Sequence, residues 1–417
     1  MGKTEICVKK FGGTSVGSVE RIDSVAERIL NDSKKDPRPT VIVASAMSGE
    51  TNRLVDLANR THMGYRGPAY DMLVASGEQV SIALLTMALE KKGLKAKPYL
   101  AYQLGIKTDS MYSRARIKEI NTDMIMKDIQ NGIIPVVAGF QGVDEFDNIT
   151  TLGRGGSDTS AVALAVALKA SECEIYTDVP GVFTADPRIV PKAHKIDKLC
   201  FEEMVEMASL GSKVLHIRSV EIAAKFQVKL HVRSTFELTE GTWIMNETDF
   251  DMESPVVTSV THDTNTAIFK LAPLPGGANV LADLFTALSE KGIVVDVISQ
   301  SELSQGQQLA FSVPVDDIFP TRQIVEKKFS AGLSSAGLSS KVDCSVMDDV
   351  SKVSIVGVGM RNHPGVAAKF FEVLAKHNIS IHLVTTSEIK VSAIVDRKDL
   401  EVAAKALHTA FGLDATP

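Results

Sequence analysis

The feature that most constrains the fold is a short apolar run that leads through glycines into a helical pattern. Residues 6–8 have the composition of a buried strand, residues 12–17 contain three glycines, and residues 19–30 return to helical spacing. A strand, a glycine turn and a helix N-terminus commonly bind anions, because backbone N–H groups and the helix dipole face the ligand. The stretch matches neither the P-loop nor the dinucleotide pattern, since Lys10 precedes the glycines. It indicates a phosphate-binding loop or, alternatively, a tight turn beside a surface lysine.

The composition is that of an ordinary folded protein. The 417 residues are 44% hydrophobic and 23% charged, and this length predicts two or three domains. A net charge of −6 argues against nucleic acid or an anionic membrane surface as the main partner. We find no membrane-spanning run and no signal peptide, and the four cysteines lack metal-ligand spacing. We therefore expect a cytoplasmic protein without a metal site of its own.

The first part of the chain alternates β-branched runs with helical segments, which favours a mostly parallel sheet covered by helices. Strands are predicted at 40–44, 133–140 and 174–178. Each precedes a polar cluster, and ligands of open α/β sheets gather outside the carboxyl ends of the strands. A functional site is therefore predicted at that edge. One long helix is also predicted from about residue 69 to residue 91, with an apolar face that comprises Met72, Leu73, Val80, Ala83, Leu84 and Met87.

The C-terminal part of the chain contains an internal repeat. An acidic stretch at 246–255 indicates a linker, and each unit beyond it shows a strand, a Pro-Gly turn, an amphipathic helix and a further strand. The two further strands are predicted at 293–298 and 379–384. This pattern predicts two small βαββαβ modules. A tandem AGLSS sequence at 331–340 is interpreted as a connector without chemistry.

Polar residues near the predicted helix N-termini are candidates for substrate binding. Arg154 precedes a Gly-Gly-Ser-Asp sequence, and its guanidinium suits a bidentate carboxylate ligand. Asp158 in that sequence places a carboxylate at a functional site or, alternatively, caps the following helix and balances its dipole. Glu78 lies among apolar residues and could receive a substrate ammonium, although a solvated helix glutamate explains it equally well.

Two further loops offer contacts for a nucleotide. A turn-rich loop at 177–188 contains Phe183, which could cover a base or ribose, and Arg188, which could meet phosphates. Residues 209–213 supply a second pairing of glycine with lysine. Each signal is weak alone, but two lysines and two arginines in such loops together suit a polyphosphate.

The motifs at 10–16, 151–158 and 177–188 together resemble the signatures of the aspartate kinase family of the amino-acid kinase superfamily. The C-terminal repeats are similar to the paired ACT regulatory domains of that family. The resemblance implies an α/β fold: a carbamate kinase-like, three-layer αβα domain at 1–248, followed by two α+β ACT domains. It places a linker, and a possible strand of the second ACT unit, at 249–262, and the ACT domains at 263–340 and 345–417.

The resemblance implies phosphoryl transfer from MgATP to L-aspartate, which gives ADP and 4-phospho-L-aspartate. This reaction opens the lysine, threonine, methionine and diaminopimelate pathways. Magnesium would be carried by phosphate oxygens and water. The implied catalytic residues are Lys10 and Asp158. The implied aspartate ligands are Ser45, Thr51, Glu78, Arg154 and Ser157, with Arg154 on the α-carboxylate and Glu78 on the amino side. The implied nucleotide ligands are Lys10, Gly12, Gly13, Tyr176, Thr177, Asp178, Phe183, Asp186, Arg188, Ser212 and Lys213.

The resemblance also implies regulation by amino acids, with lysine and threonine together as the expected effectors. The implied effector contacts are Asp296, Gln300, Thr385, Ser387 and Glu388, although each could equally be an ordinary turn or edge residue. The family association implies a homo-oligomer through the ACT domains, or a hetero-oligomer with a regulatory chain started internally at Met252. Another enzyme of the superfamily, or an amino-acid sensor with an inactive kinase half, remains an alternative.

Strand alternation sends Lys9 and Lys10 to opposite faces of their strand, and the motif register selects Lys10 for catalysis. We therefore expect substitution of Lys9 to impair the reaction far less.

Overall fold

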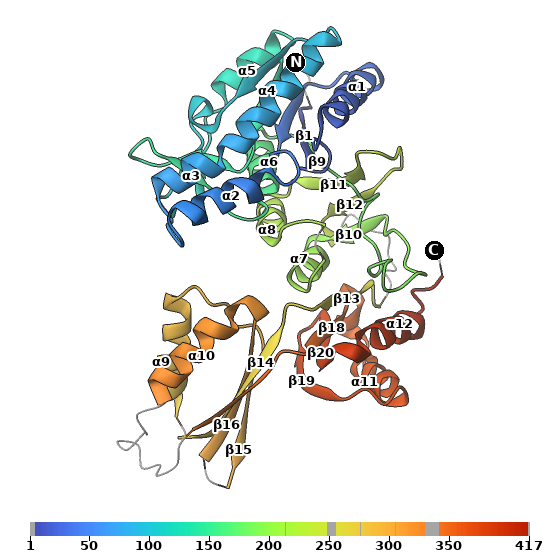
Figure 1. Cartoon of the computed structure of the whole chain (residues 1–417). Helices are drawn as coiled ribbons and strands as arrows, with labels where there is room; N and C mark the ends of the chain where they lie inside the picture. The colour runs from blue at the N-terminus through green and yellow to red at the C-terminus, as the bar shows by residue number, and fades with distance from the viewer. Residues whose placement is uncertain are drawn as a thin grey trace. The chain divides into compact units, whose positions relative to one another are not determined.

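The chain folds into two compact units (Figure 1). The computed structural model describes residues 5–212, 214–247, 256–275, 277–304, 306–329 and 342–415. The first unit contains the described residues up to 182, together with 195–209 and 214–247. The second contains 183–194, 210–212 and the described residues after 255. The predictions for Lys213, for Met252 and for the connector at 331–340 fall on residues outside the described ranges.

An eight-stranded sheet in the order β10-β12-β11-β9-β1-β2-β6-β3 forms the centre of the first unit. Its pairs are parallel except for β11 with β12. Phe11 at the end of β1 lies opposite Ala44 of β2 and Tyr176 of β9, so neighbouring strands end at one level. The strands are β1 (Cys7–Phe11), β2 (Thr40–Ala44), β3 (Ala96–Tyr99), β6 (Ile134–Ala138), β9 (Glu172–Thr177), β10 (Lys198–Cys200), β11 (Lys229–Ser234) and β12 (Thr242–Met245).

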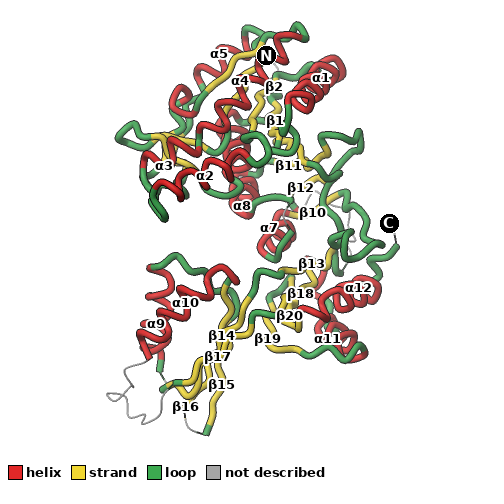
Figure 2. Tube along the Cα trace, in the orientation of Figure 1, coloured by secondary structure: helices red, strands yellow, loops and turns green. Residues whose placement is uncertain are grey.

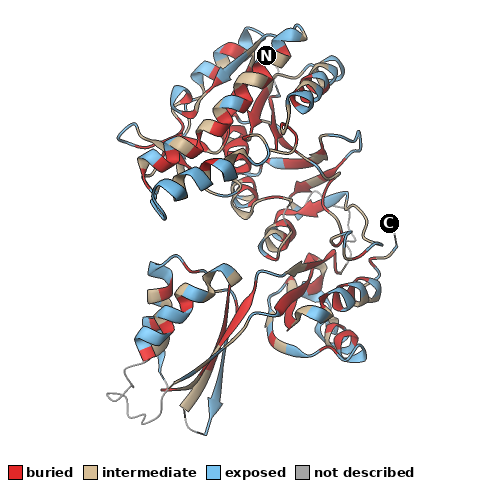
Figure 3. Ribbon diagram, in the orientation of Figure 1, coloured by how far each residue is buried: buried red, intermediate tan, exposed pale blue. Residues whose placement is uncertain are grey.

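Helices cover both faces of this sheet (Figure 2). Helices α1 (Val19–Lys35) and α4 (Ser76–Lys91) pack together on one face, whereas α6 (Gly156–Leu168) and α8 (Ile217–Phe226) pack together on the other. The strands are buried and the outer faces of the helices are exposed (Figure 3). The predicted three-layer αβα architecture is thereby confirmed. The other elements of this unit are α2 (Glu50–Thr61), α3 (Pro68–Val74), α5 (Asp123–Gln130), α7 (Phe201–Ser209) and a small sheet of β5 (Ile117–Glu119), β4 (Lys107–Thr108), β7 (Gln141–Val143) and β8 (Ile149–Thr151).

The predicted long helix and its apolar face are wrong. The stretch forms two helices, α3 and α4, and Val80 and Met87 are 48% and 60% exposed. The buried face of α4 instead carries small and polar side chains such as Glu78 and Ser81 beside aliphatic ones. By length and composition residues 68–91 could cross a membrane, but half of the apolar window is buried inside the fold. We interpret the stretch as a core helix pair.

The second unit contains two modules of four strands and two helices each, the first in the predicted order βαββαβ and the second in the chain order ββαββα. The first module consists of β14 (Ala267–Leu274), α9 (Ala278–Glu290), β15 (Ile298–Leu303), β16 (Gly306–Val313), α10 (Ile318–Phe329) and β17 (Asp343–Met347). The second consists of β13 (Ser259–Asp263), β18 (Val350–Val356), α11 (Val366–Lys376), β19 (Ile381–Thr386), β20 (Lys390–Asp396) and α12 (Leu400–Ala410). Strand β13 precedes the first module but pairs with β18, so the modules interleave, as the possible strand at 249–262 suggested.

Three sequence-based boundaries differ from the structure. Strand β17 pairs with β14, so the first module extends beyond residue 340 and includes the predicted start of the second at 345. The predicted strands at 293–298 and 379–384 begin later, at Ile298 and Ile381. Residues 183–194, expected in the first domain, belong to the second unit. There Ala185 and Val190 lie in the core of the second module.

Lys9 and Lys10 point to opposite faces of β1, as strand alternation predicts. Lys9 is 7% exposed, and its ammonium lies 2.7 Å from Asp32 and 3.1 Å from Glu174. Arg233 also contacts Glu174, at 2.9 Å. The pKa of Lys9 is raised because the neighbouring acids outweigh the effect of burial. Lys9 is therefore part of a buried ionic cluster, which the sequence did not reveal.

We expect Lys9→Ala to lower the free energy of unfolding of the first unit by about 3 kcal/mol, because the substitution breaks a buried ion pair. Trp243, the single tryptophan of the chain, lies in β12 and reports on this unit. Urea unfolding followed by its fluorescence measures the change. The exposed Lys35 provides a control, Lys35→Ala. Equal unfolding midpoints for the two variants would contradict a structural role for Lys9.

Candidate active site

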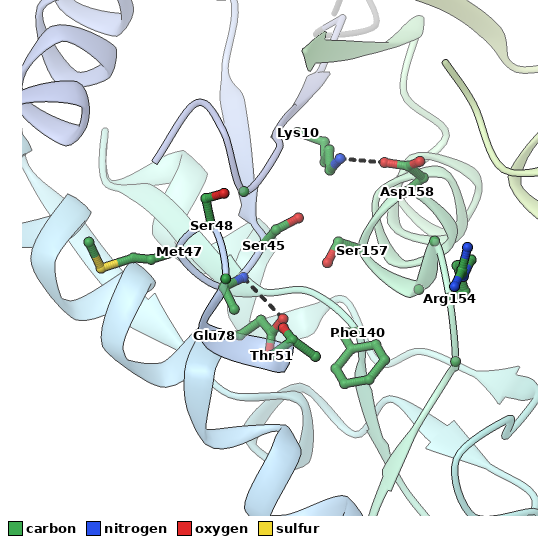
Figure 4. A pocket seen from close by; sticks show the side chains of 16 residues that line it. Lys10, Ser45, Met47, Ser48, Thr51, Glu78, Phe140, Arg154, Ser157 and Asp158 are labelled. Carbon is green, nitrogen blue, oxygen red and sulfur yellow. Dashed lines mark hydrogen bonds and ion pairs between the residues drawn. The ribbon is translucent and has the colours of Figure 1, made fainter. Parts of the chain in front are cut away.

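A pocket of about 280 Å³ opens at the carboxyl ends of β1 and β2 and at the N-terminus of α6 (Figure 4). It lies where the sequence predicted a site. The lining includes Lys10, Gly13, Asp158 and all five predicted aspartate ligands. The full set is Lys10, Gly13, Ser45, Ala46, Met47, Ser48, Gly49, Thr51, Glu78, Phe140, Gly153, Arg154, Gly155, Gly156, Ser157 and Asp158.

An ion pair joins β1 to α6 at one wall of the pocket. The Lys10 ammonium lies 2.5 Å from the Asp158 carboxylate, and the two residues are 8% and 9% exposed (Figure 4). Asp158 stands in the first turn of α6, where the helix dipole favours an acid. Ser157, one residue earlier, turns its side chain toward the same space as Ser45. Asp158 thus holds the Lys10 ammonium within reach of a ligand.

In the glycine loop after β1, one glycine N–H group is hydrogen-bonded within the described fold and the next is not. Gly12 donates its N–H to the Tyr176 carbonyl at 3.1 Å, so a phosphate would compete with this carbonyl for the predicted contact. Within the described part of the chain, the Gly13 N–H makes no hydrogen bond. A Cβ on Gly13 would lie 2.9 Å from the Ala46 carbonyl, so only glycine fits this close approach.

Glu78 brings a carboxylate into the pocket from α4. It is 2% exposed, and one oxygen accepts a hydrogen bond of 3.0 Å from the Ala46 N–H (Figure 4). The other oxygen is buried and has no partner among the described residues. Burial raises the pKa of Glu78 to about 8. The alternative of a solvated helix glutamate is therefore wrong, and the free oxygen is a strong acceptor for a buried cation.

Arg154 lies on a tight turn between β8 and α6. Gly153 and Gly155 flank it with φ of +79° and +66°, which glycine adopts without strain. A Cβ at Gly155 would meet the His216 side chain at 2.3 Å. Arg154 is exposed at the pocket rim and makes no ion pair within the described ranges. Its guanidinium is thus available to a carboxylate ligand.

The predicted nucleotide residues in the first unit lie in two environments. Thr177 is the last residue of β9 and Asp178 follows it at the carboxyl edge, where Asp178 is exposed. Tyr176 is fully buried, and its ring stacks on Phe11 with centroids 4.7 Å apart. Its hydroxyl donates to Glu174 at 2.9 Å. The Tyr176 side chain therefore packs in the core and does not line the pocket.

Four other predicted nucleotide residues, Phe183, Asp186, Arg188 and Ser212, belong to the second unit and do not line the pocket. The Arg188 guanidinium lies 2.6 Å from Asp186, and this pair holds the pKa of Asp186 below its usual range. An incoming phosphate would therefore compete with Asp186 for Arg188.

The predicted effector residues lie at the exposed sides of the two modules. Asp296 precedes β15 and forms an ion pair with the buried Lys352 of β18, which links the first module to the second. Gln300 lies within β15, and Thr385 lies within β19 rather than after it. Ser387 and Glu388 stand in the turn that follows β19.

Sequence reasoning missed several residues that line the pocket, among them Met47, Ser48 and Phe140. Met47 and Ser48 lie in the loop after β2, between the predicted ligands Ser45 and Thr51. Phe140 follows β6 with φ of +68°. Their position directly after strands was the available signal, but composition gave no reason to choose them over their neighbours.

A group of side chains with the types and spacing of metal ligands occurs elsewhere in the first unit. One ligand atom each of Cys7, Glu172 and Glu174 lies within 4.8 Å of the others. Arg38 lies 2.7 Å from Glu172, and Lys9 and Arg233 contact Glu174. Because both carboxylates are neutralised by cations, this grouping does not suit a metal ion.

Comparisons with known proteins agree with this architecture. The sequence matches the amino acid kinase family over residues 5–234 and the ACT domain over residues 353–411. The aspartokinase of Pseudomonas aeruginosa is 47% identical over 412 residues, which cover 98% of each chain. Aspartokinase 2 of Bacillus subtilis is 44% identical over 413 residues, which cover 99% of each chain.

Solved structures lead to the same family. E. coli aspartokinase III in complex with aspartate and ADP (R-state) gives a TM-score of 0.81 at 26% identity, covering 97% of this chain and 99% of that one. The same protein with lysine and aspartate (T-state) gives 0.77 at 26% identity with the same coverage. Since curated aspartokinases share nearly half of their residues with this sequence along almost their whole length, the chain belongs to the aspartate kinase family.

Proposed function

We propose that the chain phosphorylates L-aspartate with ATP and produces ADP and 4-phospho-L-aspartate, the first step toward lysine, threonine, methionine and diaminopimelate. A side-chain carboxylate oxygen of aspartate forms a bond to the γ-phosphorus, and the bond to the bridging β–γ oxygen breaks. The electron pair of that bond leaves with ADP. The observation that carries the proposal is the single pocket that combines the Lys10–Asp158 pair with Glu78 and Arg154.

The pocket supplies what this reaction needs. The attacking group is already ionised at neutral pH, so no general base is required, and catalysis rests on positioning and charge neutralisation. Lys10 neutralises charge on the transferring group, and Asp158 orients it. Gly13 offers a free N–H group to a phosphate oxygen. Thr177 at the end of β9 and Asp178 directly after it are the proposed nucleotide contacts of the first unit.

The aspartate ligands suit the charges of an amino acid. Arg154 binds the α-carboxylate through its fork of N–H donors. The unpartnered oxygen of Glu78 accepts the ammonium. Ser45, Thr51 and Ser157 line the same pocket and supply hydroxyl groups. This arrangement orients the side-chain carboxylate toward Lys10.

Magnesium enters this proposal as a partner of ATP. Asp158 is the only carboxylate besides Glu78 that lines the described pocket, and it already contacts Lys10. This donor set fits an ion that would be held mainly by phosphate oxygens and water. When bound, the ion supplies charge neutralisation on the phosphates.

The pocket predicts a strong dependence of turnover on Lys10. We expect ADP release that requires aspartate, and we expect Lys10→Ala to reduce turnover roughly a hundred- to a thousandfold, because removing a donor to developing charge costs about 2.7–4 kcal/mol. A coupled ADP assay with aspartate, with glutamate and without acceptor measures both effects.

Lys35→Ala serves as the control, since Lys35 is exposed at the end of α1. Near-normal turnover in Lys10→Ala with ATP still bound would rule out the role of Lys10. A preference for glutamate would instead favour another kinase of the superfamily, and no acceptor-dependent turnover would favour an amino-acid sensor.

The raised pKa of Glu78 predicts a pH-dependent affinity for aspartate. Below about pH 8 the buried carboxyl is protonated in the free enzyme, and the ammonium binds its ionised form. We therefore expect kcat/KM for aspartate to rise with pH up to about 8, by about tenfold per unit, because kcat/KM reports the ionisation of the free enzyme. Initial rates between pH 6.5 and pH 8.5, a range of about two pH units that includes this pKa, measure the slope. Glu78→Gln should give a lower and flatter profile, whereas an unchanged slope would contradict the assignment.

We further propose that lysine and threonine inhibit the enzyme through the ACT modules. Asp296 and Gln300 from the first module and Thr385, Ser387 and Glu388 from the second are the proposed contacts. Because Lys352 already occupies the Asp296 carboxylate, an effector ammonium must displace it or share it. Effector binding would stabilise a state that closes poorly on substrates.

The second unit contains a physical connection to the nucleotide loop. The Thr184 carbonyl accepts a hydrogen bond of 2.7 Å from the Val260 N–H in β13, and the Thr184 hydroxyl lies 2.9 Å from His408 of α12. Thr184 neighbours Phe183 and stands two residues before Asp186. A shift of β13 or α12 would therefore move the predicted nucleotide residues Phe183 and Asp186, which favours an effect on ATP binding.

We expect millimolar lysine and threonine, added together, to raise KM for ATP more than each does alone. Initial rates at varied ATP with saturating aspartate measure this change. Gln300→Ala should raise the half-inhibitory concentrations by about tenfold, equivalent to the loss of about 1.4 kcal/mol of effector binding. Rates are normalised to the uninhibited rate of each variant. An unchanged rate with both amino acids present would exclude the proposed regulation.

Edge strands support assembly through the ACT modules. Strands β15 and β19 lie at the edges of their sheets, and Ile298, Leu303 and Val384 on them are exposed. Such apolar edges commonly pair with a second chain. We propose a homo-oligomer through these edges, or a hetero-oligomer with a regulatory chain started at Met252, in the cytoplasm.

A further inference from the structure

The Arg154 turn is held by its backbone rather than by its side chain. The Arg154 guanidinium makes no hydrogen bond or ion pair with any residue that the structure describes. Its direction therefore depends on where residues 151–153 lie. Thr151 is the last residue of strand β8, and residues 152 and 153 follow it. Strand β8 is an edge strand that pairs only with β7 in its sheet. The outer edge of β8 consequently needs other partners for its backbone groups.

Asp71 of α3 supplies one of these partners. It is 0% exposed and accepts hydrogen bonds of 2.6 Å from the Thr151 N–H and 2.9 Å from the Ser113 N–H. Bonds from N–H groups to a carboxylate are stronger than neutral ones. Asp71 thus holds β8 to the loop at 113–115, and a Cβ on Gly153 would lie 2.9 Å from the Ser113 carbonyl of that loop.

Arg218 of α8 holds the same segments through their carbonyls. It donates one hydrogen bond of 2.9 Å to the Leu152 carbonyl and another of 2.7 Å to the Ala115 carbonyl. Ala115 in turn donates its N–H to the Thr151 carbonyl at 2.9 Å. No carboxylate within the described ranges forms an ion pair with Arg218, and burial lowers its pKa. Burying a cation without a counterion destabilises the fold unless hydrogen bonds compensate for its lost hydration.

We propose that Asp71 and Arg218 are positioning residues that fix Thr151 and Leu152 and thereby aim Arg154 at the α-carboxylate of aspartate. Neither residue lines the pocket, so each acts through the backbone. The Asp71 carboxylate, from α3, binds the Thr151 N–H, and the Arg218 guanidinium, from α8, binds the Leu152 carbonyl. The glycine turn that carries Arg154 therefore begins at a fixed position. The inference rests on the proposed role of Arg154 as the carboxylate ligand.

The test compares Arg218→Lys with the wild-type chain. Lysine keeps the positive charge, but it lacks the forked guanidinium with which Arg218 binds both carbonyl groups. We expect KM for aspartate to rise about tenfold while KM for ATP changes by less than about twofold, since displacing a binding group by about 1 Å can cost up to about a hundredfold. The inhibition constant of β-alanine, which lacks the α-carboxylate, should stay unchanged. Asp71→Asn should show the same pattern, and the exposed Arg116 provides the control, Arg116→Lys.

A double-mutant cycle with Arg154→Ala separates positioning from a general structural role. In the Arg154→Ala background, Arg218→Lys should raise KM for aspartate no further. Additive effects, or equal losses for aspartate, ATP and β-alanine, would overturn the proposal. If Arg154→Ala raises KM for aspartate and Arg218→Lys does not, this proposal alone fails. If Arg154→Ala has no effect, the assigned role of Arg154 fails as well. Thermal melting verifies that each variant is folded.

Discussion

The site depends on one ion pair between β1 and α6. Lys10 leaves the end of the strand and Asp158 stands in the first turn of the helix, 2.5 Å away. Both residues are buried, so water competes little with the contact between the two charges. Because an unpaired charge at this depth would be unfavourable, the helix must stay close to the strand. The same contact that holds two elements together therefore keeps an ammonium at the position where a phosphoryl group would carry charge.

Much of this site could be predicted because parallel strands end at one edge. Ser45 follows β2 and Lys10 lies one residue before the end of β1, so two separate sequence motifs were expected to meet. Their spacing along the chain is irrelevant once the strands are paired in register. Glu78 was harder, since a glutamate in a helix is ordinarily solvated. Its burial follows from the close packing of small residues on α4, which an apolar-face pattern does not reveal.

The errors have physical causes that the sequence alone does not expose. Val80 and Met87 were assigned to the core because they are large and apolar, whereas the helix buries its small and polar side. Tyr176 follows the strand motif of a nucleotide site, but its alternation on β9 turns the ring onto Phe11. Lys9 lies on the face opposite Lys10, as strand alternation predicts, but its buried ionic cluster was not expected. In each case the decisive information was which face of an element meets its neighbour.

The division of the chain into units shows why sequence order is a poor guide to regulation. Residues 183–194 lie within the stretch that matches the amino acid kinase family, yet Ala185 and Val190 are buried in the core of the second ACT module. A loop anchored by apolar packing cannot relax independently of that core. Any rearrangement of β13 or α12 must therefore carry Thr184 and its neighbours with it. Under the proposed regulation, an effector signal would need no long relay, because the predicted nucleotide residues at 183–188 belong to the second unit itself.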